Sequence, residues 1–286
     1  MITTAETSRI REFEFSDEDF RSLRELVRQV SGITLSEAKR ELVYGRLSRR
    51  LRTLGMTSFR DYRALLAGPE GKAELGEFTN AVTTNLTSFF RENHHFEYLR
   101  DHVLAPLAAS PARRHRLRIW SAGCSTGEEP YSIAMTIAET LPDWQKHDIR
   151  ILATDLDTDV LRRAANGVYT EDRVRGLTAR RRQTFFTPGQ EKGHTAYRFD
   201  PQLAGLISFR QLNLMDPLPM RGPLEAIFCR NVVIYFDKDT QRELFARIAP
   251  LQGVDALLFL GHSESLFRVS DAYDLIGKTI YRRTKG

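Results

Sequence analysis

Apolar residues recur at the spacing of amphipathic helices through the first part of the chain. Between residues 16 and 67 they form two series: Phe20, Leu23, Leu26 and Val27, then Val43, Leu47, Leu51 and Leu54. A stretch containing glycine and proline, residues 68–71, interrupts this pattern, which resumes afterwards. The pattern predicts a helical N-terminal domain over residues 1–75 and a linker helix over 76–90.

After the helical region, short apolar runs alternate with helical ones. The runs typical of buried strands are Leu117–Ser121, Asp148–Thr154, Ile207–Gln211, Glu225–Cys229, Ala256–Leu260 and Thr279–Arg282. Helical patterns lie between several of them, at Pro130–Leu141, Thr158–Ala165 and Thr240–Pro250. This alternation is typical of a parallel sheet covered by helices, so we predict an α/β domain over residues 91–286.

One interval of the α/β region is too long for an ordinary connection. It extends from Tyr169 to Leu206 and contains an arginine cluster at 180–182 and the alternating segment His194–Phe199. We therefore expect an inserted helix and a small β excursion there.

The composition excludes several classes of protein. Hydrophobic residues make up 41% and charged residues 28% of the 286 positions, as in an ordinary folded chain. No apolar run approaches the roughly 20 residues that cross a bilayer, and no signal-peptide core is present, so we expect neither membrane insertion nor export. Cys124 and Cys229 are too few for a disulfide framework or a zinc site, which favours a cytoplasmic protein without a metal. The net charge of +5 permits an acidic partner without identifying one.

The first predicted strand runs into a glycine-containing turn at the place where open α/β sheets bind ligands. Gly123 and Gly127 let backbone approach a ligand, but their G-x-x-x-G spacing matches neither common phosphate-binding motif and no lysine follows. Glu128 and Glu129 would repel a pyrophosphate and attract an amine. The turn thus favours a nucleotide with an amino-acid moiety and no phosphate chain, although such turns also occur as simple tight connections.

Acidic residues follow the second predicted strand. We assign Asp155 to the two hydroxyls of a ribose, which a carboxylate can accept together. Asp157 is assigned to the N-cap of the helix that begins near Thr158, since aspartate is favoured at that position. The alternative interpretation is that Asp155 or Asp157 only caps this helix.

Polar residues follow two later strands as well. Asn213 and Leu214 offer an amide and an apolar side chain suited to the edge and face of adenine, although asparagine at a strand end is often a turn residue. Arg230 and Asn231 interrupt two apolar runs. Because buried polar groups need partners, this pair belongs either to the site or to a local polar network.

Four segments of this sequence form long motifs: Asn80–Glu92, Ser125–Ser132, Phe228–Phe236 and Gly261–Glu264. They closely resemble motifs of the CheR family of bacterial chemotaxis receptor methyltransferases. The resemblance extends from about Phe15 to Tyr281. It implies an all-α N-terminal domain followed by a class I S-adenosylmethionine-dependent methyltransferase (Rossmann-like) domain, with a small β-subdomain inserted near residues 175–206. It also implies the function: with S-adenosyl-L-methionine as cofactor, such an enzyme methyl-esterifies glutamates on the cytoplasmic helices of chemoreceptors during chemotactic adaptation.

The resemblance further implies roles for individual residues. Arg91 is suited to the methionine carboxylate, and Arg230, Asn231 and Tyr235 line the methyl-transfer end. The catalytic residues that the resemblance implies are Arg91, Arg230 and Tyr235. In some members of the family the β-subdomain binds a tether peptide at the receptor's C-terminus. Together with Gly123 of the glycine-containing turn, the residues expected to bind the cofactor are Asn85, Thr87, Arg91, Glu129, Asp155, Asn213, Leu214, Arg230 and Asn231.

A glutamate nucleophile has little need of acid or base catalysis. Its carboxylate has a pKa of about 4.3 and is ionised at neutral pH, so no general base is required. The task is to align the carboxylate oxygen, the methyl carbon and the sulfur with water excluded. Tyr235 and Arg230 are suited to holding the incoming carboxylate, although too strong an ion pair would lower its reactivity. His94, His95 and His262 are interpreted as structural.

A basic segment offers a surface for an acidic substrate. From Lys39 to Arg52 there are six basic residues and one acidic residue. Receptor methylation helices present several glutamates, so we expect the basic helix face to dock them in a salt-dependent way. The alternative is a solvated helix face without a partner. The docking residues we expect are Arg46, Arg49, Arg50 and Arg52.

Two other functions remain open at this point. A nucleic-acid methyltransferase would use the same cofactor fold and a basic helix, but this helix has only Tyr44 to stack on a base. The segment after Cys229 also lacks the Asn-Pro-Pro-Tyr-like element of amino-methylating enzymes, so we expect no nucleic-acid partner. The second alternative is a cofactor-binding module without catalysis.

Overall fold

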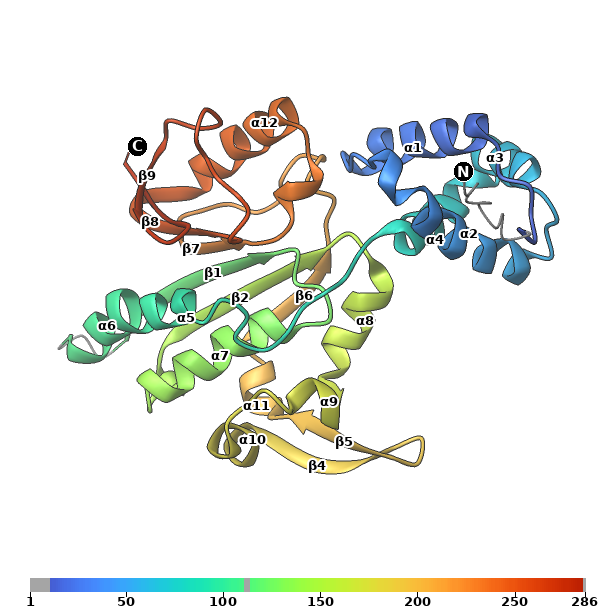
Figure 1. Cartoon of the computed structure of the whole chain (residues 1–286). Helices are drawn as coiled ribbons and strands as arrows, with labels where there is room; N and C mark the ends of the chain where they lie inside the picture. Colours follow the sequence, from blue (N-terminus) through green and yellow to red (C-terminus); the bar gives the residue numbers. More distant parts are fainter. Residues whose placement is uncertain (1–10, 111–113, 285–286) are drawn as a thin grey trace, which may run out of the picture. The chain divides into compact units, whose positions relative to one another are not determined.

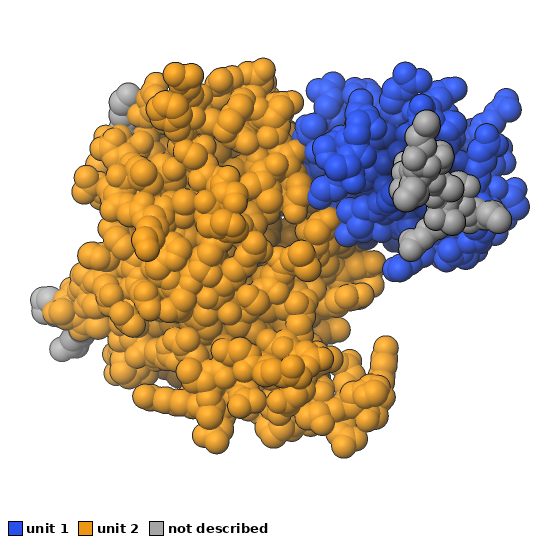
Figure 2. Space-filling view, in the orientation of Figure 1, with its two compact units in different colours: residues 1–83 blue, residues 84–286 orange. Residues whose placement is uncertain are grey.

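The computed structural model describes residues 11–110 and 114–284 and divides into two compact units, residues 1–83 and 84–286, coloured separately in Figure 2. None of the helices in these described ranges combines the length and the apolar character that crossing a membrane requires.

The first unit is helical, as the sequence predicts. Ser16 is the N-cap of its first helix, and its hydroxyl oxygen accepts from the backbone amide of Asp19. The Asp19 carboxylate in turn accepts from the backbone amide of Ser16, which completes a capping box. Buried apolar residues from each of the four described α-helices form its core, including Phe20, Leu47 and Phe78. The elements are α1 (Asp17–Ser31), η1 (Glu37–Lys39), α2 (Arg40–Leu54), α3 (Phe59–Ala67) and α4 (Gly71–Val82).

The linker differs from the helix expected over 76–90. Helix α4 ends at Val82, and Thr83 has extended backbone. Because Phe78 is fully buried in the helical core, α4 belongs to the first unit, and residues 83–88 have no helical structure. The structural boundary therefore lies at residue 83, after the 1–75 range expected for the helical domain.

The second unit contains a seven-stranded sheet with the order β6-β2-β1-β7-β8-β10-β9. The strands from β6 to β8 are parallel, and β10 is antiparallel to both of its neighbours. Ile119 in β1 pairs with Ile151 of β2 and Ala226 of β7, and all three are buried. The strands are β1 (Arg116–Ala122), β2 (Asp148–Asp155), β6 (Ile207–Gln211), β7 (Leu224–Cys229), β8 (Gln252–Leu260), β9 (Tyr273–Gly277) and β10 (Ile280–Arg283).

Helices lie in most of the connections between the parallel strands, and several of them pack with the strands in one hydrophobic core (Figure 1). Helix α7 is buried along most of its length, which places its first turn inside the protein. The elements are α5 (His94–Leu99), η2 (Arg100–Leu104), α6 (Ala105–Ala109), α7 (Glu128–Thr140), η3 (Trp144–Lys146), α8 (Thr158–Asn166), η4 (Val233–Tyr235), α12 (Lys238–Ile248) and η5 (Ala249–Leu251).

The overlong interval forms a β-subdomain with its own three-stranded antiparallel sheet, in the order β3-β5-β4. Figure 1 shows the β4–β5 hairpin extending from the body of this unit. The inserted helix and β excursion expected from the sequence are confirmed. The elements are β3 (Val168–Thr170), α9 (Glu171–Val174), α10 (Ala179–Phe185), β4 (Phe186–Glu191), β5 (His194–Phe199) and α11 (Pro201–Ala204).

Each strand and helix predicted between residues 117 and 282 is present, with ends shifted by a few residues. Strand β9 and helices α5 and α6 were not predicted, because their short segments carry little hydrophobic periodicity.

Candidate active site

The site lies where the parallel strands end. The carboxyl ends of β6, β2, β1, β7 and β8 meet at one edge of the sheet, so the residues that follow them lie together. The chain proceeds from β1 to β2 on one side, whereas β7 lies on the other side of β1. Such a reversal in strand order is the usual ligand-binding position of open α/β sheets.

The turn from β1 into α7 contains two glycines in the left-handed backbone conformation. Gly123 has φ 103° and Gly127 has φ 95°. A Cβ on Gly123 would lie 2.3 Å from the Val232 side chain, and one on Gly127 would lie 2.9 Å from the Tyr169 hydroxyl oxygen. The Gly123 amide donates to the carbonyl oxygen of Thr154 at 2.7 Å, which holds the turn against the end of β2. The turn therefore requires glycine at both positions.

Glu129, in the first turn of α7, is buried against Arg230. Arg230 Nη1 donates to Glu129 Oε2 at 2.9 Å, and Ser121 Oγ donates to the other carboxylate oxygen at 2.7 Å. Burial raises the pKa of Glu129, while the guanidinium of Arg230 and the Ser121 hydroxyl oppose that rise. The Arg230 side chain is only 2% exposed. Its guanidinium thus orients Glu129 from within the protein.

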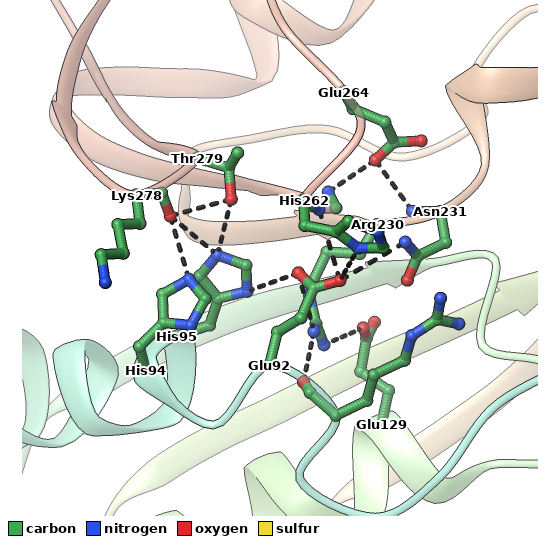
Figure 3. A network of polar contacts seen from close by, with 12 residues as sticks. Glu92, His94, His95, Glu129, Arg230, Asn231, His262, Glu264, Lys278 and Thr279 are labelled. Atoms are coloured by element: carbon green, nitrogen blue, oxygen red, sulfur yellow. Dashed lines mark hydrogen bonds and ion pairs between the residues drawn. The ribbon is translucent and has the colours of Figure 1, made fainter.

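Glu92 presents a second carboxylate to Arg230 (Figure 3). Its Oε2 lies 3.3 Å from Arg230 Nη2, which also donates to the carbonyl oxygen of Arg91. Its Oε1 lies 2.9 Å from Nδ1 of His262. Burial acts to raise the pKa of Glu92, but the hydrogen bonds from His262 and the charge of Arg230 outweigh it and lower this pKa to about 2. The carboxylate is therefore ionised at neutral pH.

Asp155, at the end of β2, accepts two backbone hydrogen bonds. Its carboxylate oxygens accept from the amides of Ser125 at 2.8 Å and Asp157 at 3.0 Å. Burial raises the pKa of Asp155, and these two amides oppose the rise. Asp157 is the N-cap of α8 and accepts from the amides of Asp159 and Val160, so its predicted capping role is confirmed.

The segment from residue 84 to 93 brings three expected cofactor residues to unit 2. Asn85 Nδ2 donates to Asp157 Oδ2 at 2.8 Å. Arg91 Nη1 donates to a carbonyl oxygen of the same segment at 2.8 Å. The carbonyl oxygen of Thr87 accepts from Arg173 Nη1 at 3.1 Å. The contacts of Asn85 and Thr87 tie the segment to the N-cap of α8 and to α9.

Asn213 and Leu214 follow β6 in a loop held by α12. Asn213 Oδ1 accepts from the amide of Met215 at 3.0 Å, and Leu214 is buried. Arg247 in α12 donates to the carbonyl oxygens of Leu214 and Met215 at 2.8 and 3.0 Å. The loop expected at an adenine is thus fixed by a residue distant in the sequence.

Asn231 and Tyr235 lie in the loop after β7, which a buried carboxylate holds. Asn231 has φ 58°, and Tyr235 is half-buried in η4. Burial raises the pKa of Glu264, and the amides it binds oppose the rise. Glu264 accepts from the backbone amides of Asn231 at 2.8 Å, Val232 at 2.8 Å, Ile234 at 3.2 Å and Gly261 at 2.5 Å.

The side chains at this edge fit a ligand that carries positive charge and hydrogen-bond donors. Three carboxylates, those of Glu92, Glu129 and Asp155, surround the strand ends, whereas Arg230 is the cation that pairs with the first two. Ser125 Oγ is buried and has no hydrogen-bond partner among the described residues. An ammonium group would pair with the carboxylates, and a neighbouring ribose would give Ser125 Oγ a hydrogen-bond partner, because buried polar groups require partners.

The residues expected to dock a substrate lie in the helical unit, on α2. Arg50 forms a bidentate pair with Glu74 at 2.7 and 2.6 Å, and Arg52 pairs with Glu12 at 2.9 Å. Arg46 donates to the backbone carbonyl oxygens at the end of α4. Arg49 is exposed, and none of the ion pairs between described residues includes it. These intramolecular partners leave Arg49 the most available of the four.

Comparison with known proteins connects this geometry to a family. The model of the CheR methyltransferase SAM binding domain matches residues 85–282, and that of the CheR methyltransferase all-alpha domain matches residues 18–83. The chain belongs to the CheR methyltransferase family. S-adenosylmethionine is therefore its cofactor, and the two matched ranges coincide with the two structural units.

Relatives within the CheR family cover nearly the whole chain. The chemotaxis protein methyltransferase of Escherichia coli is 43% identical over 275 residues, 94% of this chain and 92% of that protein. Chemotaxis protein methyltransferase 2 of Pseudomonas aeruginosa is 45% identical over 272 residues, 94% of each chain. A probable chemotaxis protein methyltransferase of Rhizobium etli is 44% identical, over 89% of this chain and 95% of that protein.

Sequence reasoning missed several residues that build the site. Glu92, Arg173, Arg247 and Glu264 each bind groups far away along the chain, so spacing alone gives no signal for them. For Glu92 and Glu264 a signal existed, since both lie within the four motif segments quoted above.

Proposed function

We propose that this chain transfers the methyl group of S-adenosylmethionine to glutamate side chains on the cytoplasmic helices of chemoreceptors. The observation that carries the proposal is the buried Glu129–Arg230–Glu92 cluster at the end of β1 and β7, inside the range of the SAM binding domain. Two carboxylates against one guanidinium suit the ammonium end of that cofactor. The proposal places the protein in the cytoplasm, where those receptor helices lie.

The chain's own residues would hold the cofactor at the strand ends. In this proposal Asp155 binds the ribose hydroxyls, Asn213 and Leu214 the adenine, and Glu129 the ammonium group. When bound, the cofactor supplies an electrophilic methyl group on a positively charged sulfur. Asn85, Thr87 and Arg91 would close this end from the segment that precedes α5, with Arg91 at the methionine carboxylate.

The attack needs no proton removed from the substrate, since a glutamate side chain is ionised at neutral pH. The catalytic contribution is then orientation and exclusion of water. Arg230 is buried between Glu129 and Glu92, which supports a role in fixing the cofactor site more than in gripping the substrate. Tyr235, half-buried in η4, is the residue we propose at the incoming carboxylate.

Receptor binding would use two further surfaces. The exposed Arg49 on α2 is suited to an acidic helix. In the β-subdomain, β4 is an edge strand with exposed residues from Thr187 to Glu191. An extended peptide from a receptor C-terminus could pair with such an edge.

Labelled methyl transfer tests the function directly. The purified protein is incubated with cofactor carrying a radioactive methyl group, together with either a receptor cytoplasmic fragment or RNA. We expect label on the receptor fragment, released as methanol by mild base, because that lability marks a carboxyl methyl ester. A receptor fragment with its glutamates replaced by alanine is the control.

Other distributions of the label would contradict the proposal. Base-stable label would indicate a different acceptor group, and label on RNA would indicate a nucleic-acid methyltransferase. Cofactor binding without transfer to any receptor fragment would favour a binding module.

A further inference from the structure

Glu92 has a backbone conformation that a residue with a side chain adopts only at a cost. Its φ is 55°, and Phe90, two residues earlier, has φ 53°. Such strain persists where surrounding contacts hold it, and it gathers at functional sites. Here the strained turn directs the Glu92 carboxylate toward the loops that follow β7 and β8, as Figure 3 shows.

The Glu92 carboxylate joins these two loops. Its Oε1 accepts from the backbone amide of His262 at 3.3 Å and from Nδ1 of the same residue at 2.9 Å, and lies 3.5 Å from Nδ2 of Asn231. Because an ionised carboxylate only accepts, Nδ1 of His262 carries its proton. Oε2 faces Arg230 at 3.3 Å and Nδ1 of His95 at 3.7 Å.

His95 supplies no positive charge to this carboxylate. It is fully buried, and its Nε2 lies 3.2 Å from the carbonyl oxygen of Lys278, an acceptor, so Nε2 carries the proton of the neutral ring. Burial lowers the pKa of His95 to about 3, with the charge of Arg230 acting in the same direction. Arg230 is therefore the cation that compensates Glu92 Oε2.

The charges of the buried cluster do not cancel. With both carboxylates ionised, Glu92 and Glu129 contribute two negative charges and Arg230 one positive charge, which leaves one negative charge. For stability alone one carboxylate per buried arginine would suffice, and a surplus buried charge is costly. Glu129 paired with Arg230 alone would be a neutral unit with little attraction for a further cation.

We propose that Glu92 is a positioning residue for the amino-acid end of the cofactor: it holds Arg230 and supplies the surplus negative charge that lets Glu129 bind an ammonium group. The inference rests on the proposed function, because it assigns the cofactor's ammonium to Glu129. Glu92 acts through Arg230 and has no role in adenosine binding.

The test compares two ligands that differ in the amino-acid end. S-adenosylhomocysteine carries the ammonium, whereas 5′-methylthioadenosine has the same nucleoside and thioether without it. Calorimetry on the full chain measures both dissociation constants for the wild type, Glu92→Gln and Glu97→Gln. Glu97 is exposed on α5 and binds Asn93, so its substitution is the matched loss of one carboxylate.

Glu92→Gln is expected to weaken S-adenosylhomocysteine binding about tenfold, the effect of one charged hydrogen bond, and to leave 5′-methylthioadenosine binding unchanged. Glu97→Gln should bind both ligands as the wild type does. If Glu92→Gln does not fold, Glu92→Asp replaces it: this variant keeps the negative charge but withdraws it from Arg230 by one methylene group, so a smaller loss of S-adenosylhomocysteine affinity is expected, again with 5′-methylthioadenosine binding unchanged.

Three results would overturn the inference. Equal weakening of both ligands would make Glu92 a structural member of the turn. Unchanged affinity for S-adenosylhomocysteine would show that the surplus charge has no part in binding. Failure of the wild type to bind either ligand would contradict the proposed function itself, and the inference with it.

Discussion

Arg230 illustrates how single residues at this site combine burial with charge. Its guanidinium lies between two carboxylates, with the ring of Phe96 5.6 Å away, and has almost no contact with solvent. Removing one partner from a buried ion pair leaves an uncompensated charge, which costs about 3–5 kcal/mol. Substitutions at Arg230 therefore combine loss of stability with loss of function, whereas Glu92→Gln changes the charge with nearly the same shape.

His95 gives a prediction about pH. Its pKa in the folded protein is about 3, against 6.5 for an ordinary histidine, so the unfolded chain binds a proton that the folded one excludes. The stability that His95 contributes is present above pH 6.5 and is lost as the pH falls toward 3. At pH 5 the loss amounts to about 2 kcal/mol.

Nuclear magnetic resonance on the imidazole carbons tests this prediction. The His95 signal, assigned by comparison with the His95→Gln variant, is expected to stay in its neutral position from pH 8 to pH 5, while a histidine in a short peptide titrates in that range. A midpoint above pH 5 for His95 would contradict the lowering of its pKa by burial and by the charge of Arg230.

At the scale of elements, the loops after the strands are fixed by side chains from other elements. Glu264 binds backbone amides of the loop after β7, Arg247 of α12 binds carbonyl oxygens of the loop after β6, and Arg173 binds the segment before α5. The site therefore depends on contacts between elements distant in sequence.

This arrangement explains what the sequence could predict. Asp157 was identified as an N-cap because capping depends on residues two or three positions away. The strands of the large sheet other than β9 were predicted because each contains a short apolar run. In contrast, Arg50 of α2 was assigned to substrate docking, yet its acceptor Glu74 lies on α4. A charged residue's partner is set by tertiary packing, which helical periodicity does not reveal.

Helix α2 carries its own prediction. Arg49→Glu should lower kcat/KM for receptor methylation about fivefold or more at low ionic strength, because a positive charge that attracts an acidic helix becomes a repulsive one. The loss should shrink as salt screens the interaction, and cofactor affinity should not change. Initial rates at two salt concentrations measure this effect.

Arg60→Glu is the matched control, since Arg60 is an exposed arginine on α3 and its reversal changes the net charge equally. Equal rates for the wild type and Arg49→Glu at low salt would remove Arg49 from the docking surface. Equal losses in both variants would indicate an effect of net charge alone.

At the scale of the whole molecule, parallel strands bring residues that are distant in the sequence to one edge of the sheet. The site residues are spread between residues 85 and 264, whereas each motif segment of the sequence is short. The central claim is that this edge binds S-adenosylmethionine through Asp155 and the cluster around Glu129.

Calorimetric titration of the full chain with S-adenosylhomocysteine tests that claim most directly, because it needs no receptor. We expect saturable binding at one site per chain. Asp155→Ala should weaken it by about 1.5–3 kcal/mol, the range for hydrogen bonds to a charged group. Absence of binding by the wild type, verified by equilibrium dialysis, or an unchanged affinity of Asp155→Ala, would contradict the account.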